Sequence, residues 1–94
     1  MKPVNQPRSS VAAKYTMAVT VMMTGVAAFK IRRYEKAGLC KPARTASRQR
    51  LYSDHDLKLI GEINKLAESG VNPAGIKIIL AMQNRQNPPS NRPK

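Results

Sequence analysis

The residues of this chain best suited to chemistry are its basic side chains, which concentrate between Lys30 and Tyr52. That segment contains one acid, Glu35, against Lys30, Arg32, Arg33, Lys36, Lys41, Arg44, Arg48 and Arg50. A field of ammonium and guanidinium groups attracts phosphate, and a guanidinium can also pair bidentately with a guanine edge. The segment reads as a basic helix, a Gly stop, a Pro-containing turn and a basic loop. This order predicts a helix followed by a β-wing.

The composition places the chain among small, basic binding proteins. Its 94 residues allow one domain with a small core, so binding at the surface is favoured over an enclosed active site. The formal net charge of +12 indicates an anionic partner, nucleic acid first and an acidic membrane surface second. With one cysteine, Cys40, and one histidine, His55, neither an internal disulfide nor a Cys/His zinc site is expected. We therefore expect a reducing compartment and no metal or other cofactor.

The apolar run MAVTVMMTGVAAF, residues 17–29, could be read as membrane-embedded or as part of a folded core. It is too short to span a bilayer, and Gly25 interrupts it where positive φ would allow a turn. Two short helices joined by a turn are therefore expected, and a membrane location is not. No nucleophile, base and orienting group form a motif anywhere in the chain, so an enzyme is not expected either.

Composition shifts divide the chain into three parts. Residues 1–14 are polar with two prolines and predict a flexible basic arm, and residues 85–94 predict a disordered basic tail. Residues 15–84 form the expected domain. Its first half should contain helices over 18–23 and 27–37, the first with Val19, Met22 and Met23 in the core. A hairpin should follow, pairing residues 39–40 with 50–52 around a loop over 43–49.

The second half of the domain predicts two more helices. Ser53 and Asp56 resemble a capping box at the start of the first, whose apolar positions recur at helical spacing before Gly70 ends it. Asn72 and Pro73 supply a cap and a first-turn proline for the last helix. The apolar residues of these two helices are Leu57, Ile60, Ile63, Leu66 and Ala67, then Ile76, Ile79 and Leu80. The predicted fold is mainly α, with four helices and one β-hairpin.

At this point the sequence resembles the DNA-binding domain of the mercuric-resistance-regulator (MerR) family. The matching strings are IRRYEKAGL (31–39), PARTASRQRLYSDHDL (42–57) and LAESGVNPAGIKIIL (66–80). The last string is similar to the second wing of the short repressors of glutamine-synthetase and heat-shock genes. The resemblance implies a winged helix-turn-helix that binds double-stranded DNA as a transcriptional regulator. Helix 27–37 would read the major groove, and the wing would hold flanking phosphates.

Three departures from the family pattern bear on function. Arg33 replaces the first Tyr of the Arg-Tyr-Tyr-Glu signature, and Ala27 stands where a polar helix cap is usual. Family members usually pair through a long helix after the fourth, and here the Pro-rich tail takes that place. The resemblance therefore favours simple repression, with weak or DNA-dependent self-association.

The expected DNA-binding residues are Lys30, Arg32, Arg33, Tyr34, Lys41, Arg44, Arg48, Arg50 and Tyr52. Phosphate contact is more common than base contact for any one Arg, and Lys30 could equally be a solvated surface residue. Tyr34 could pack between helix and wing or donate to a phosphate, and Tyr52 has the same two interpretations. Glu35 should pair with Arg32 or with the wing.

Two other functional classes share this charge. An RNA-binding or ribosome-associated basic protein would use the same cations, although Phe29 is the only Phe and there is no Trp to build a stacking platform. An excisionase-like factor that bends DNA would share the winged fold. The favoured function is sequence-specific binding of double-stranded DNA, in the cytoplasm and associated with the nucleoid.

Overall fold

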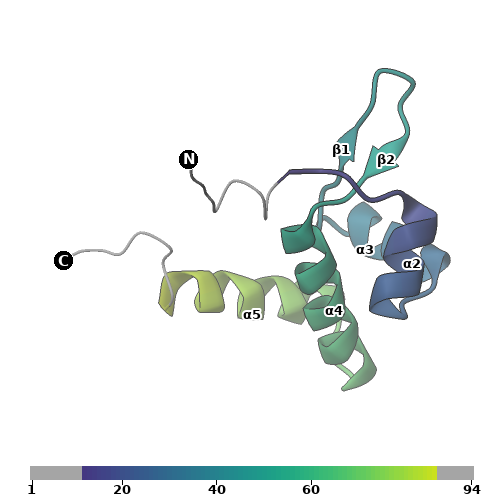
Figure 1. Cartoon of the computed structure of the whole chain (residues 1–94). Coiled ribbons are helices and arrows are strands. Elements are labelled where there is room, and N and C mark those ends of the chain that lie inside the picture. The colour runs from purple at the N-terminus through teal and green to yellow at the C-terminus, as the bar shows by residue number, and fades with distance from the viewer. Residues whose placement is uncertain (1–11, 87–94) are drawn as a thin grey trace, which may run out of the picture.

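The computed structural model describes residues 12–86 and contains four helices and one hairpin. The elements are α2 (Met17–Thr24), α3 (Ala28–Lys36), β1 (Ala43–Arg44), β2 (Arg50–Leu51), α4 (Asp54–Glu68) and α5 (Pro73–Gln86). Helix α4 lies in the centre and contacts α2, α3 and α5, while the hairpin projects from the α3 side and α5 extends away from it (Figure 1). The predicted fold class is confirmed.

The expected arm and tail fall largely outside the described residues. Of the arm, residues 12–14 are described, and the Lys14 N–H donates to the Tyr52 carbonyl at 2.9 Å. Of the tail, residues 85 and 86 belong to α5. Residues 1–11 and 87–94 lie outside the part that the structure describes, so the flexible arm and the disordered tail stay predictions.

A tight turn at Gly25 joins α2 to α3. Gly25 has φ 75°, in the left-handed region, and its N–H donates to the Val21 carbonyl at 2.9 Å. Helix α2 is capped by Thr16, whose Oγ1 accepts from the Val19 N–H at 3.3 Å. Helix α3 starts after Ala27, which makes no side-chain cap. The expected lack of a polar cap is confirmed, so α3 depends on tertiary packing of its apolar side.

Gly38 ends α3 and turns the chain into the core. Its φ of 80° and the hydrogen bond from the Leu39 N–H to the Tyr34 carbonyl, 2.9 Å, form a Schellman motif. Leu39 and Cys40 are thereby buried, at 6% and 7% exposure. Burial raises the pKa of the Cys40 thiol to about 11, so the thiol is protonated at neutral pH. Cys40 is therefore a small core residue and lies outside the hairpin strands.

The predicted pairing of the hairpin is wrong. Residues 39–40 do not form the first strand; β1 begins after Pro42, with Ala43 opposite Leu51 and Arg44 opposite Arg50. Pro42 has no N–H to donate, and the residues before it are committed to the core. Tyr52 pairs instead with Tyr15, through N–H to carbonyl bonds of 2.7 and 2.9 Å. The segment before α2 thus joins the wing to the body.

Helices α4 and α5 form as their sequence predicts. The Asp56 N–H donates to Ser53 Oγ at 3.0 Å and the Ser53 N–H to Asp56 Oδ2 at 2.9 Å, so the capping box is confirmed. Asn72 Oδ1 accepts from the Gly75 N–H at 2.8 Å and caps α5. The buried apolar core consists of Val26, Ile31, Tyr34, Leu39, Cys40, Tyr52, Ile60, Ile63 and Ile76.

The buried face of α2 differs from the one expected. Val19, Met22 and Met23 are exposed, Met22 at 83%, whereas Thr20 is completely buried and Val21 packs against the core. Helix α2 is apolar on most of its circumference, so its pattern does not select a face. Within residues 12–86, no helix is long and apolar enough to cross a membrane.

The three tyrosines provide a test of this packing. Burial raises the pKa of Tyr34, burial raises that of Tyr52 to about 12, and a hydrogen bond to Asp54 raises that of Tyr15, all from an ordinary 10.0. As the pH rises, the tyrosines of the unfolded chain lose their hydroxyl protons before those of the folded protein. The contribution of the tyrosines to the free energy of unfolding should therefore be fully present below pH 10 and decline as the pH rises toward 12. In the folded protein, phenolate absorbance should show no titration step at the ordinary tyrosine pKa. The substitution Tyr52→Phe should remove the step that occurs at the highest pH. A Tyr52 step near pH 10 in the folded state would contradict the packing.

Candidate nucleic-acid interface

Helix α3 presents a basic stripe to solvent, formed by Phe29, Arg32, Arg33 and Lys36. These four residues are exposed and follow i, i+3, i+4, i+7 spacing, so they lie on one face. The opposite face carries Ile31 at 0% and Tyr34 at 5% exposure, packed in the core. The burial of that apolar side orients the stripe outward.

The two flanks of α3 are held by ion pairs on different elements. On one flank Lys30 Nζ lies 3.1 Å from Glu68 Oε2 of α4. On the other, Glu35 turns toward the wing and accepts three hydrogen bonds from Arg50: Nε to Oε1 and Oε2 at 3.0 Å each, and Nη2 to Oε1 at 2.8 Å. The expectation that Glu35 pairs with the wing is confirmed. The Arg50 guanidinium is therefore engaged in a contact within the protein.

The Glu35–Arg50 pair is well sheltered for an ion pair of so small a domain. The Glu35 side chain is 15% exposed and that of Arg50 27%, so water screens the pair less than it would on the open surface. The hydrogen bonds to Glu35 raise the pKa of Arg50 above its usual value. Arg44 Nη2 adds a longer contact of 3.7 Å to Glu35 Oε1. The base of the wing is therefore tied to α3.

The wing loop carries the remaining exposed cations, Lys41, Arg44 and Arg48. Arg48 takes a left-handed backbone conformation with φ 70°, and its N–H donates to the Thr45 carbonyl at 2.8 Å. Arg44 Nη1 donates to the Arg48 carbonyl at 3.1 Å, which braces the loop from within. An ordered turn therefore carries the basic side chains of the wing.

Two of the residues predicted to bind DNA point into the protein. The Tyr34 hydroxyl donates to Asn64 Oδ1 at 2.7 Å, and that of Tyr52 lies 3.8 Å from Met17 Sδ. Tyr52 is 1% exposed. The structure thus supports the packing interpretation of both tyrosines. They position α3 and the wing relative to α4 and the segment before α2.

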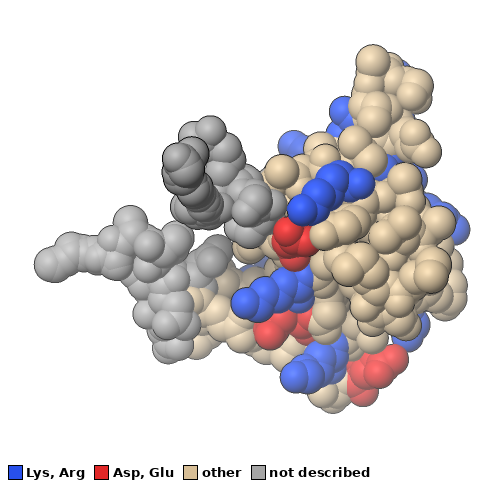
Figure 2. All heavy atoms as spheres, viewed as in Figure 1, with Lys and Arg blue, Asp and Glu red and all other residues tan. Residues whose placement is uncertain are grey.

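The acids of the chain are separated from this surface. Asp54, Asp56, Glu62 and Glu68 all lie on α4, and Glu35 is neutralised by Arg50. On the face over α4, carboxylates lie beside lysine or arginine atoms and the charge is mixed (Figure 2). The outward stripe of α3 and the wing loop contain cations and no acid. Because Glu35 and Arg50 join α3 to the base of the wing, we treat the exposed cations of these two elements together and call them the basic face.

Two members of the stripe were not in the predicted set. Lys36 and Phe29 share the exposed face with Arg32 and Arg33, and the Arg33 Cζ lies 5.6 Å from the centroid of the Phe29 ring. Helical spacing from the apolar residues Ile31 and Tyr34 would have identified both, since the opposite face of an amphipathic helix is solvated.

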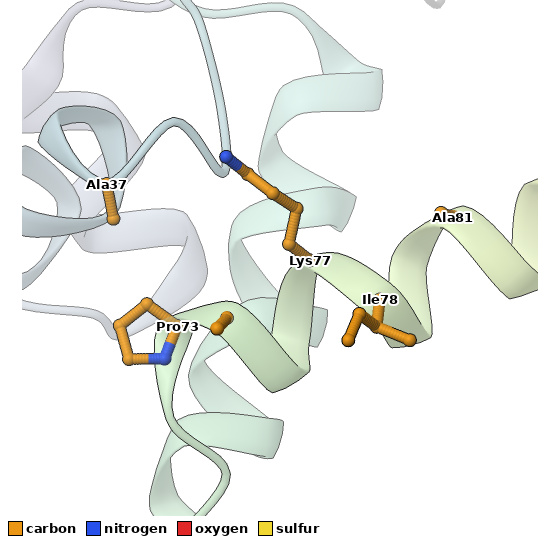
Figure 3. A pocket seen from close by; sticks show the side chains of 6 residues that line it. Ala37, Pro73, Lys77, Ile78 and Ala81 are labelled. Carbon is orange, nitrogen blue, oxygen red and sulfur yellow. The ribbon is translucent and has the colours of Figure 1, made fainter.

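The structure also has an open hollow between the end of α3 and α5 (Figure 3). Its lining is Ala37, Pro73, Ala74, Lys77, Ile78 and Ala81, with the Lys77 side chain reaching toward the loop after α3. These side chains offer one amine, that of Lys77, and no carboxylate, thiol or hydroxyl beside it. Across residues 12–86, no three His, Cys, Asp or Glu side chains lie together as metal ligands would. The basic face is therefore the candidate functional site.

A solvent-facing basic helix after a Gly turn, with a hairpin tied to its side, defines the winged helix-turn-helix class of proteins. The chain belongs to the MerR HTH family of regulatory proteins, whose sequence profile matches residues 15–83. The resemblance identified in the sequence is confirmed. The family consists of regulatory proteins, which agrees with the expectation that this chain is not an enzyme.

Several relatives illustrate the match. The protein described as heat shock protein HspR of Streptomyces coelicolor is 36% identical over 72 residues, covering 76% of this chain and 48% of the relative. The transcriptional regulator GlnR of Bacillus anthracis is 36% identical over 75 residues, covering 80% of this chain and 58% of the relative. The chain thus spans about half the length of these curated relatives.

A solved structure shows the same architecture. HiNmlR, described as a MerR family regulator lacking the sensor domain and bound to promoter DNA, matches with a TM-score of 0.67 and 27% identity. The match covers 73% of this chain and 53% of HiNmlR.

The tie between Glu35 and Arg50 can be measured directly. Glu35→Gln keeps the shape of the side chain but removes the negative charge of the carboxylate that accepts hydrogen bonds from Arg50. This substitution should destabilise the protein by about 1–2 kcal/mol. Urea denaturation of Glu35→Gln, Arg50→Gln and the double variant gives the coupling energy. Glu62→Gln, an exposed acid of α4, is the matched control and should change stability little. Strictly additive losses in the double variant would mean that the pair does not hold the wing.

Proposed function

We propose that this protein is a transcriptional regulator that binds double-stranded DNA sequence-specifically, with α3 in the major groove and the wing on flanking phosphates. The observation that carries the proposal is the basic face, an acid-free surface in which an exposed helix and a hairpin are tied together. The fold is that of a family whose member HiNmlR was solved on promoter DNA. By this proposal the protein works in the cytoplasm, at the nucleoid.

The roles of the basic residues follow from their positions. Arg32 and Arg33 stand on the outward stripe of α3, where a bidentate guanidinium can pair with guanine O6 and N7. Lys36, Lys41, Arg44 and Arg48 grip phosphates, which set register and orientation without sequence information. Arg50 contributes by holding the wing in place, because its guanidinium already donates its hydrogen bonds to Glu35. Lys30 contributes by holding α3 against α4, since it is paired with Glu68.

The outward stripe of α3 favours duplex DNA over structured RNA. An outward helix of this kind fits the wide major groove of B-DNA, whereas the major groove of A-form RNA is too deep and narrow for side chains to read. Competition between a DNA duplex and an RNA duplex of the same sequence distinguishes the two. Preferential retention of RNA would overturn the proposal in favour of the RNA-binding alternative.

The phosphate contacts should make binding depend strongly on salt. Each neutralised phosphate releases counterions, so the logarithm of the binding constant should fall with the logarithm of salt at a slope of about −4 to −7 per chain. Arg48→Gly removes one contact and also suits the left-handed backbone there, so it should weaken binding to all duplexes alike and reduce the slope by about 1. Lys58→Ala, an exposed cation of α4 off the basic face, is the control and should change neither. A nearly flat salt dependence would exclude the electrostatic mechanism.

A base contact by Arg32 should affect specificity as well as affinity. Arg32→Ala should cost about 1–3 kcal/mol on the preferred site and relax the preference for that site. The preferred site is obtained by selection from a random duplex pool, and binding is compared on that site and on a scrambled duplex. Equal losses on both duplexes would make Arg32 a phosphate contact.

We further propose that the protein represses transcription, and that two copies assemble on DNA. DNA raises the effective concentration of two chains bound at neighbouring half-sites. At micromolar concentration the chain by itself should sediment as a monomer, and a duplex with two half-sites should bind two copies cooperatively. One-half-site duplexes provide the control. A stable dimer without DNA would contradict DNA-dependent pairing and indicate another pairing surface.

A further inference from the structure

Phe29 is the one apolar side chain on the otherwise cationic stripe of α3. Its side chain is 55% exposed, although burying a ring of that size would be favourable. It lies in the first turn of α3, one turn before Arg33, whose guanidinium rests over the ring at 5.6 Å from the centroid. The stripe therefore begins with an aromatic ring and a cation held beside it.

The major groove of DNA offers an apolar partner for such a ring. Each thymine projects its C5-methyl group into the groove, and aromatic and aliphatic side chains contact it there. In a helix-turn-helix, the N-terminal residues of the recognition helix are the ones that contact base edges. Phe29 occupies that position in α3.

We propose that Phe29 determines sequence specificity by contacting a thymine C5-methyl group, while Arg33 pairs with a neighbouring guanine. This inference rests on the proposed function, because it needs α3 in the major groove. The contact buries the exposed ring and gives α3 a preference that the phosphate contacts cannot provide.

The pairing of Phe29 with Arg33 also predicts how far apart the two bases lie. The cation–π contact restricts the Arg33 side chain before DNA arrives, which lowers the entropy lost on binding. The 5.6 Å between guanidinium and ring spans about one to two base-pair steps of roughly 3.4 Å. The selected site should therefore contain a thymine one or two base-pair steps from a guanine pair.

The test removes the methyl group from the DNA and the ring from the protein. In the duplex selected by the wild-type protein, each thymine is replaced singly by deoxyuridine, which lacks only the C5-methyl group. One replacement should weaken wild-type binding about fourfold, the fold-change for about 0.8 kcal/mol of lost apolar burial. Phe29→Ala should bind the thymine and deoxyuridine duplexes equally at that position, whereas Phe29→Leu should retain part of the difference.

Met22→Ala is the matched protein control, because Met22 is an exposed apolar side chain of α2 and should leave the methyl effect unchanged. Deoxyuridine effects of the same size in wild type and Phe29→Ala, or no effect at any thymine, would overturn the assignment of Phe29 while selection of a defined site upheld the proposed function. Failure to select any site would overturn both. The DNA substitution leaves the protein unaltered, so misfolding of a variant cannot imitate these results.

Discussion

The relative position of α3 and the wing depends on the Glu35–Arg50 ion pair. A small domain can place two elements on one ligand only if they are held at a constant distance, and a two-stranded hairpin is marginally stable without other support. Glu35 accepts three hydrogen bonds from Arg50 at 2.8–3.0 Å in a sheltered position. The single acid of the basic segment is therefore what anchors the wing to α3.

The same pair explains how the basic face is kept free of acid. Four of the five acids lie on α4, where Asp56 caps the helix and Glu68 binds Lys30. The remaining acid, Glu35, is paired with Arg50. Of the cations that face outward from α3 and the wing loop, Arg44 lies 3.7 Å from Glu35, which is already paired with Arg50. The positive charges of this surface therefore reinforce one another. The charge over α4 is mixed (Figure 2), whereas the exposed stripe of α3 and the wing loop contain cations and no acid.

Local signals predicted the elements, and tertiary packing decided how they were used. The capping box of Ser53 and Asp56 and the stop at Gly38 involve residues a few positions apart, so both were readable from the sequence. The hairpin register was predicted wrongly because Leu39 and Cys40 have the apolar character of strand residues, but the turn at Gly38 buries them in the core. The predicted buried face of α2 was also wrong, because Met22 and Met23 are no less apolar than Val21, which packs against the core, and Thr20, which is completely buried.

The sequence by itself determined the four helices, the hairpin and the excess of positive charge, because these depend on composition and short-range spacing. The resemblance of three motifs to the MerR family identified the family. Only the tertiary structure decided which of the predicted DNA-binding residues are available to a ligand. Tyr34, Tyr52 and Arg50 belong to the predicted set yet are used inside the protein, by Asn64, by the Tyr15 segment and by Glu35. Their partners are 15 to 37 positions away in the chain. Contacts over such separations arise from packing, and no local pattern encodes them.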